Sequence, residues 1–297
     1  GVELMRNVQG DEAAAHLGAA AWNGREAQDA RYVWPYMFSA LADEYARRYG
    51  LSYDHIGEIA RINYENGRVN PNAQTRRWTF NEKSFTEDDE ENPVIEGRIR
   101  RQDCGQVTDG ASVVFLASRR FAEEYLARRG LQRRAISQIE GWGHRTATML
   151  FADKVAASAN ASHVFPHVRG AITDAFSRAG IGGVDDLDAI ETHDCFAITE
   201  YMAIDHFGVT EPGKSWQAVE DGSIAKGGRI PINPSGGLIG LGHPVGATGV
   251  RMALDAHRQV TGTAEACQVD GAERVATLNI GGSATTTVCS IYGTLPN

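Results

Sequence analysis

The pattern of apolar and polar positions changes character near residue 106 of this 297-residue chain. Before that point the sequence is polar and irregular, apart from two stretches with apolar residues at helical spacing. These stretches predict helices at about Tyr32–Arg48 and Tyr53–Asn66. After residue 106, short apolar runs rich in β-branched residues alternate with helical patterns. This alternation predicts a layered α/β fold in which helices cover a mixed sheet.

The predicted elements of the second part follow one another in regular succession. Helical spacing predicts helices at Phe121–Arg129, Val164–Ala179, Phe196–Phe207 and Gly249–Val260. Apolar runs predict strands at Ala111–Leu116, Arg134–Glu140, Leu187–Thr192, Arg274–Ile280 and Thr285–Tyr292. We expect the last two strands to form a closing pair around Gly281-Gly282.

Charge and cysteine spacing exclude some classes of function. The formal net charge of −9 argues against nucleic-acid binding, because phosphate contacts need a basic surface. No apolar run approaches the roughly 20 residues that span a bilayer, and no secretory signal is visible, so we expect a cytoplasmic protein without a membrane span. The cysteines are widely spaced and predict neither a disulfide scaffold nor a metal site: Cys104, Cys195, Cys267 and Cys289.

The strongest chemical signal is a histidine in a glycine-rich turn that leads into a predicted helix. The segment Asn233–Gly249 places His243 among glycines on both sides. Glycine lets backbone approach a ligand closely, so a ring nitrogen of His243 can lie beside free backbone N–H groups. Such an arrangement suits the stabilisation of a developing oxyanion.

Two further segments carry polar side chains at predicted strand ends. His193-Asp-Cys-Phe196 follows one strand and begins a helix, where a thiol can have a lowered pKa and a histidine can bind a substrate oxygen. A buried, inert cysteine in a packed turn explains this segment equally well. Asn279-Ile-Gly-Gly-Ser-Ala284 separates the last two strands and is by itself more typical of a tight hairpin. We expect the three segments to open towards one side of the sheet, as a catalytic site requires.

These segments resemble those of the thiolase superfamily. Gly240–Gly249 matches the GHP segment of thiolases, and His193–Phe196 is similar to the variant found in the sterol-carrier-protein type of thiolase. Val275–Gly282 resembles the C-terminal strand pair. Cys104–Ala111 and Asn70–Gln74 are similar to parts of the thiolase loop domain and of its return to the core.

The resemblance implies two similar halves, each a mixed five-stranded sheet covered by helices, with an inserted loop domain that helps to hold coenzyme A. Residues 1–105 would be mostly loop domain, 106–130 the end of the first half, and 131–297 the second half. It also implies a homodimer or a dimer of dimers, and coenzyme A as a co-substrate rather than a tightly bound cofactor. The sequence itself identifies no cofactor-binding residues.

The resemblance also assigns roles to four residues. His243 would activate a cysteine nucleophile and contribute to a first oxyanion hole, which His193 would complete. Cys195 would be the acid/base at the substrate α-carbon, and the backbone of Gly281 would belong to a second oxyanion hole. Asn279 stands where many thiolases have the acid/base cysteine, as in the sterol-carrier-protein type.

The nucleophilic cysteine of the family has no counterpart among the four cysteines of this chain. Cys104 lies at the return to the core and not at a helix start, so we do not expect it to fill that role. The resemblance places the nucleophile upstream of Gly1. Since the chain opens without methionine inside an apolar phrase, Gly1-Val-Glu-Leu-Met5, we expect a fragment or a processed piece.

The sequence therefore favours a thiolase-type acyltransferase of lipid metabolism, such as an acetyl-CoA acetyltransferase or an enzyme of fatty-acid β-oxidation. It would cleave 3-oxoacyl-CoA or condense acyl-CoA units through an acyl-cysteine intermediate. Two alternatives stay open. One is an aldolase-like carbon–carbon lyase acting on acyl-CoA, and the other is a non-catalytic subunit that binds coenzyme A or lipid.

Overall fold

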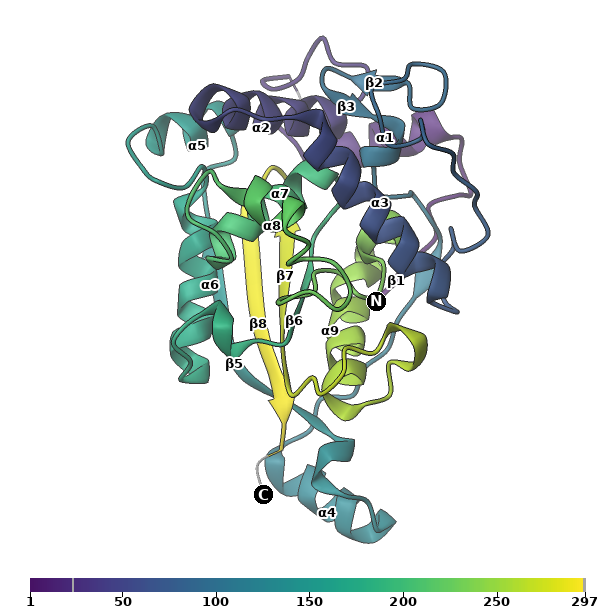
Figure 1. Ribbon diagram of the computed structural model, residues 1–297, viewed down its shortest axis with the longest axis vertical. Coiled ribbons are helices and arrows are strands. Elements are labelled where there is room, and N and C mark those ends of the chain that lie inside the picture. Colours follow the sequence, from purple (N-terminus) through teal and green to yellow (C-terminus); the bar gives the residue numbers. More distant parts are fainter. Residues whose placement is uncertain (23, 296–297) are drawn as a thin grey trace.

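A four-stranded sheet forms the centre of the molecule, shown in Figure 1 as a computed structural model that describes residues 1–22 and 24–295. Its strand order is β5-β8-β7-β6. The strands are β5 (Ser137–Thr146), β6 (Ala189–Thr192), β7 (Arg274–Gly281) and β8 (Thr286–Thr294). β8 runs antiparallel to both neighbours, whereas β6 and β7 are parallel. The carboxyl ends of β6 and β7 therefore lie at the same edge of the sheet.

Helices cover both faces of this sheet. α6 (Pro166–Ala179) packs so closely on β5 that a Cβ atom at Gly143 would lie 1.8 Å from the carbonyl oxygen of Ala171. α9 (Val245–Thr261) packs on the opposite face, where it shares an apolar cluster with Ala189 and Tyr292. Because strand residues alternate between faces, Glu191 points to the α9 face with Ala189.

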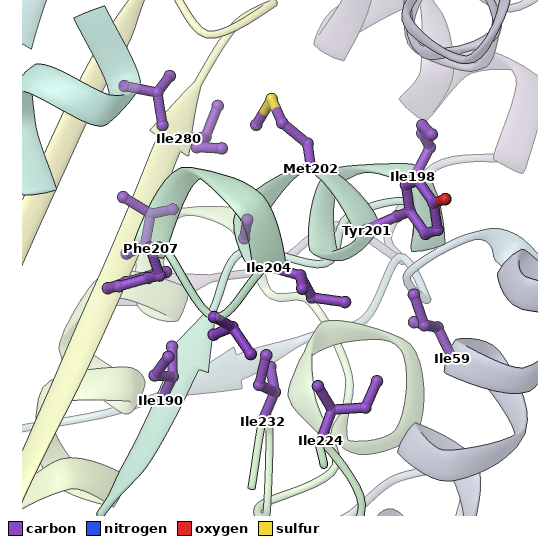
Figure 2. Packing of buried hydrophobic residues seen from close by; sticks show 14 of the residues in the cluster. Ile59, Ile190, Ile198, Tyr201, Met202, Ile204, Phe207, Ile224, Ile232 and Ile280 are labelled. Carbon is purple, nitrogen blue, oxygen red and sulfur yellow. The ribbon is translucent and has the colours of Figure 1, made fainter. Parts of the chain in front are cut away.

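α7 (Ala197–Phe207) lies in the middle of the core, and every one of its residues is buried. A helix that is buried all round must find apolar neighbours in every direction. Figure 2 shows Ile198, Met202 and Phe207 leaving α7 in different directions, with Ile190 of β6 and Ile280 of β7 on the sheet side. The helix that follows the His193–Phe196 segment is thus held firmly, and so is Phe196, the residue that leads into it.

The remaining elements surround this body. The helices are α1 (Gly10–Gly18), α2 (Val33–Tyr49), α3 (Tyr53–Val69), α4 (Arg119–Arg129), α5 (Phe151–Ala157) and α8 (Ser215–Glu220), and the short strands are β1 (Val2–Glu3), β2 (Val94–Glu96), β3 (Ile99–Arg100) and β4 (Gly110–Ala111). Figure 1 shows α2 and α3 at the end of the molecule near α7, and α4 at the opposite end. Among the described residues, no helix is long and apolar enough to cross a membrane.

The structure confirms the predicted helices and the closing strand pair, with ends that differ by a few residues. One predicted strand is wrong: within Ala111–Leu116 only Ala111 is in a strand, because β4 pairs with the short β1. Ser112 still exchanges backbone hydrogen bonds with Gly1, and among the described residues no strand pairs with 113–116. The strand predicted at Arg134–Glu140 is β5, which begins at Ser137 and extends to Thr146. The sequence analysis missed α1, α5 and α8, which are short.

The sheet has four strands in place of the five that the family resemblance implies. Residues 230–233 lie beside the free edge of β6, where Ile190 N donates to Pro231 O at 3.0 Å and Asn233 N donates to Ile190 O at 2.7 Å. Proline at 231 has no N–H group, and the pairing is limited to one bridge between Ile190 and Ile232. This segment takes the place of a fifth strand without forming one.

Candidate active site

Three segments of the chain meet at the carboxyl edge of the parallel strands. β6 ends at Thr192, which is paired with Leu278 of β7, and His193 follows directly. β7 continues from Leu278 to Asn279, whose amide lies 3.6 Å from the position of a Cβ atom at Gly249 in α9. The structure therefore brings the ends of β6 and β7 and the first turns of α9 together, as the sequence analysis predicts.

Two imidazole rings lie edge to face at this edge of the sheet. The ring centroids of His193 and His243 are 5.2 Å apart, and the ring planes are nearly perpendicular. Burial lowers the pKa of His193 to about 3, with a further contribution from the charge of Arg251. Burial also lowers the pKa of His243 well below its ordinary value, and His193 and Arg251 add to this effect. Both rings are therefore neutral at physiological pH.

A threonine one turn into α9 fixes the tautomer of His243. The Thr248 hydroxyl lies 2.8 Å from His243 Nδ1 and donates its only proton to the carbonyl oxygen of Pro244 at 3.1 Å. With the hydroxyl proton assigned to the carbonyl oxygen of Pro244, Nδ1 is the donor to Thr248. The lone pair of the neutral ring is consequently on Nε2, where it can accept a proton.

A buried aspartate anchors the glycine-rich segment. Residues Gly237–Leu241 form one π-helical turn, and Asp194 accepts hydrogen bonds from Leu238 N at 2.6 Å and Ile239 N at 3.1 Å. A Cβ atom at Gly237 would lie 2.3 Å from Asp194 Oδ2, so glycine is required there. Asp194, the second residue of the His193–Phe196 segment, therefore ties the two histidine-bearing segments together.

Arg251 links the glycine-rich segment to the end of β6 through its side chain. Nη1 of Arg251 in α9 donates to Ser235 Oγ at 3.0 Å and to Asp255 Oδ2 at 2.8 Å, and it lies 3.8 Å from Glu191 Oε2. Ser235 Oγ in turn donates to Glu191 at 2.7 Å. The sequence analysis missed Thr248 and Arg251, although their spacing of three residues, five and eight positions after His243, places them on one face of the helix.

Cys195 lies next to this edge, two residues after His193. Its Sγ atom is 4.0 Å from the hydroxyl of Thr199, and within the described part of the chain no hydrogen bond joins it to either imidazole. Burial raises the pKa of this thiol to about 12. The lowered pKa considered for a thiol at a helix N-terminus is therefore wrong here, because loss of hydration outweighs the helix terminus.

The other thiols are also protonated. Burial raises the pKa of Cys267 to about 11 and shifts that of Cys104 well upward, with Asp103 and Cys195 contributing at Cys104. Cys289, on β8, is completely buried. Since thiolates are the nucleophilic form, no cysteine of this chain has the environment of an activated nucleophile.

Gly281 is the last residue of β7 and begins a tight turn into β8. Thr285 N donates to Gly281 O at 3.0 Å, and the buried Lys154 holds the turn through Ser283 Oγ at 2.8 Å and Thr285 Oγ1 at 2.9 Å. Asn279 donates to the sulfur of Met252 in α9. The place of Gly281 in an oxyanion hole stays a prediction, as does the role of Cys195 as an acid.

Comparisons with known proteins agree with these observations. A family model described as "Thiolase C-terminal domain-like" matches residues 151–294. The chain is 33% identical, over 98% of its own length and 71% of the relative's, to an acetyl-CoA acetyltransferase of Methanothermobacter thermautotrophicus. It is 31% identical to sterol carrier protein 2 of Oryctolagus cuniculus, of whose length it spans 45%.

A solved structure of an Ltp2-ChsH2(DUF35) aldolase has the same fold. Its TM-score is 0.68 with 18% sequence identity, over 97% of this chain and 68% of that one. At this level of identity the likeness concerns the architecture alone.

Proposed function

Because this chain belongs to the thiolase superfamily, we propose that its imidazole pair performs the proton transfer and oxyanion stabilisation of acyl transfer between coenzyme A thioesters. The observation that carries the proposal is the geometry of His193 and His243. Two neutral rings are in contact at the carboxyl edge of parallel strands, and the tautomer of one of them is fixed.

In the proposed reaction a cysteine thiol transfers its proton to Nε2 of His243 and attacks the C3 carbonyl of a 3-oxoacyl-CoA. The C2–C3 bond then breaks, the acyl group stays on sulfur, and the enolate of the shorter thioester takes a proton at C2. His193 donates a hydrogen bond to the thioester oxygen while it carries negative charge. The thiol of free coenzyme A finally displaces the acyl group from the cysteine, and condensation is the reverse sequence.

The four thiols of this chain constrain where the acyl group is held. Each has surroundings that raise its pKa, although Cys104 and Cys195 are only partly buried, so we propose that none of them is acylated and that the nucleophile belongs to other polypeptide sequence. Cys195 suits the proton donor at C2, because a thiol with a pKa of about 12 keeps its proton until a carbanion takes it.

The test uses protein purified from its native source, so that any polypeptide joined or bound to this chain comes with it. Acetoacetyl-CoA and free coenzyme A are supplied, and the acyl-enzyme is located by peptide mass spectrometry. We expect His243→Asn to lower the rate by about 10²–10⁴-fold, the usual worth of a general base. His144→Asn, at an exposed histidine on β5, is the matched control. Full activity in His243→Asn contradicts the proposal.

A carbon–carbon lyase is the second candidate, favoured by the raised thiol pKa values. In this reaction Nε2 of His243 removes the hydroxyl proton of a 3-hydroxyacyl-CoA. The C2–C3 bond breaks to give an aldehyde or ketone and a thioester enolate, and the enolate is then protonated. No nucleophilic thiol is needed.

The two candidates differ in what they require. Acyl transfer needs free coenzyme A, forms an acyl-cysteine and is abolished by iodoacetamide. The lyase acts on 3-hydroxyacyl-CoA without added thiol and survives alkylation. If neither substrate is turned over and coenzyme A binds with the same affinity to the His243→Asn variant, the chain acts as a binding subunit.

A further inference from the structure

The two histidines of the site need opposite tautomers if they act together. A general base needs a lone pair on the nitrogen that faces the substrate, whereas a donor to an oxyanion needs a proton there. Thr248 supplies the first requirement, since it fixes the lone pair of His243 on Nε2. The corresponding partner of His193 is not visible as a direct hydrogen bond.

Three buried nitrogen atoms of His193 and Arg251 have no hydrogen-bond partner among the described residues. They are Nδ1 of His193 and Nε and Nη2 of Arg251. Buried polar atoms of this kind are commonly bridged by bound water. Nδ1 is an acceptor in the neutral tautomer that carries its proton on Nε2, and the two guanidinium atoms are obligate donors, so the three atoms are complementary in that tautomer.

Arg251 and His193 lie near each other beside the end of β6. Glu191, near the end of β6, points to the face that α9 covers, and His193 follows that strand after Thr192. Nη1 of Arg251 makes the contacts to Ser235, Asp255 and Glu191 described above. Nε and Nη2 have no partner among the described residues, and the charge of Arg251 acts on His193.

We propose that Arg251 is a positioning residue that donates, through a bound water molecule, to Nδ1 of His193 and so makes Nε2 the proton-bearing nitrogen of that ring. One face of α9 would then impose opposite tautomers on the two rings, with Thr248 acting on His243 and Arg251 on His193. The charge of Arg251, which lowers the pKa of both histidines, acts in the same direction by keeping them neutral.

The proposal explains why an arginine occupies this position. The donors of a lysine all lie on one nitrogen, which would be positioned by Ser235 and Asp255, whereas a guanidinium carries further donors on a second edge that can reach a different site. The catalytic consequence, a donor at His193 Nε2, rests on the proposed function. The tautomer itself does not.

The test is the ¹⁵N NMR spectrum of the histidine rings at pH 7, with His193 assigned by loss of its signals in His193→Asn. We expect His193 to carry its proton on Nε2 alone, with the Nδ1 signal displaced as for a hydrogen-bond acceptor. In Arg251→Lys, which keeps the positive charge between Glu191 and Asp255, that displacement should disappear and an Nδ1–H population should emerge. Arg258→Met, two turns further along α9, is the control and should leave the signals unchanged.

Two results would overturn the proposal: a proton on Nδ1 of His193 in the unmodified protein, or identical Nδ1 signals in the Arg251→Lys and Arg258→Met variants. Where acyl transfer is measurable, Arg251→Lys should lower kcat about tenfold, the worth of roughly one hydrogen bond in the transition state. If the protein shows no acyl transfer, the proposed function fails while the NMR result still decides the role of Arg251.

Discussion

β8 and the segment at residues 111–116 carry the same kind of local sequence and have different structures. Both are rich in β-branched and apolar residues. β8 pairs with β5 on one side and β7 on the other, and Ile291 is completely buried. In the other segment only Ala111 is in a strand, and Phe115 is 95% exposed.

The difference shows that a strand-like pattern becomes a strand only where a partner covers it. Each pairing satisfies backbone N–H and C=O groups and buries one set of side chains, and two-stranded pairs without further support are marginal in water. Ala111 ends β4, whose partner β1 is two residues long, and Ser112 exchanges backbone hydrogen bonds with Gly1. The chain that leads into this segment is held at Gln106, whose carbonyl oxygen accepts from His243 N at 2.9 Å, and at Gly105, whose N donates to Cys195 O at 2.8 Å.

Hydrogen exchange gives the largest expected contrast between these regions. Backbone amides in β7 and β8 should exchange at least about a thousandfold more slowly than those of residues 113–117, because the former open only with the whole body. Exchange measured by mass spectrometry on overlapping peptides tests this. Equal protection of both segments would mean that residues 113–117 have a partner that we have not identified.

Truncation of one apolar side chain in each region compares their contributions to stability. Ile291→Ala should lower the free energy of unfolding by about 2–5 kcal/mol, because it leaves a cavity between β8 and α6. Phe115→Ala should change it by less than about 0.5 kcal/mol, since the ring is already in water. Urea denaturation followed by fluorescence measures both. A large effect of Phe115→Ala would contradict the comparison.

Upstream of residues 111–116, the attachment of the chain at Asp103 to Tyr53 of α3 should depend on pH. Burial raises the pKa of Asp103 to about 7, while Tyr53 and the backbone of Arg100 donate to its carboxylate and lower it. The unfolded state loses this proton near pH 4 and the folded state near pH 7. As the pH rises from about 4 to about 7, the contribution of Asp103 to the free energy of unfolding should therefore decrease, by at most about 4 kcal/mol.

Asp103→Asn isolates this contribution, because the asparagine does not titrate. We expect the variant to have a flatter profile of unfolding free energy between pH 4 and 7 than the unmodified protein. The difference between the two profiles removes the effects of Glu191, Asp194 and other buried carboxyl groups. Parallel profiles would show that Asp103 does not control the attachment.

A matched pair of glycine substitutions examines how tightly the body itself is packed. Gly143→Ala should destabilise the protein by about 1–3 kcal/mol, because its methyl group would collide with Ala171 O. Gly183→Ala, where φ is 173° and no atom lies within 4 Å, should have little effect. Thermal unfolding of both variants measures the difference. A neutral Gly143→Ala would mean that α6 can move away from β5.

The sequence by itself determined the order of the longer helices and the strands from Val164 onward, with the short α8 missed, as well as the α/β class and the position of the three polar segments. These depend on local periodicity and on turn residues, so the chain carries them without reference to distant contacts. The resemblance of Gly240–Gly249 to thiolases then gave the family. His193 and His243 were identified because both lie in motifs.

Only the tertiary structure decided which of these segments touch and in what chemical state. The edge-to-face contact of His193 and His243, the hydrogen bond of Thr248 to His243 and the contacts of Arg251 join residues from different elements. The raised pKa of Cys195 and the absence of a strand at residues 113–117 depend on what surrounds them. Burial and pairing are properties of the neighbours that a segment finds in space, and local sequence does not record them.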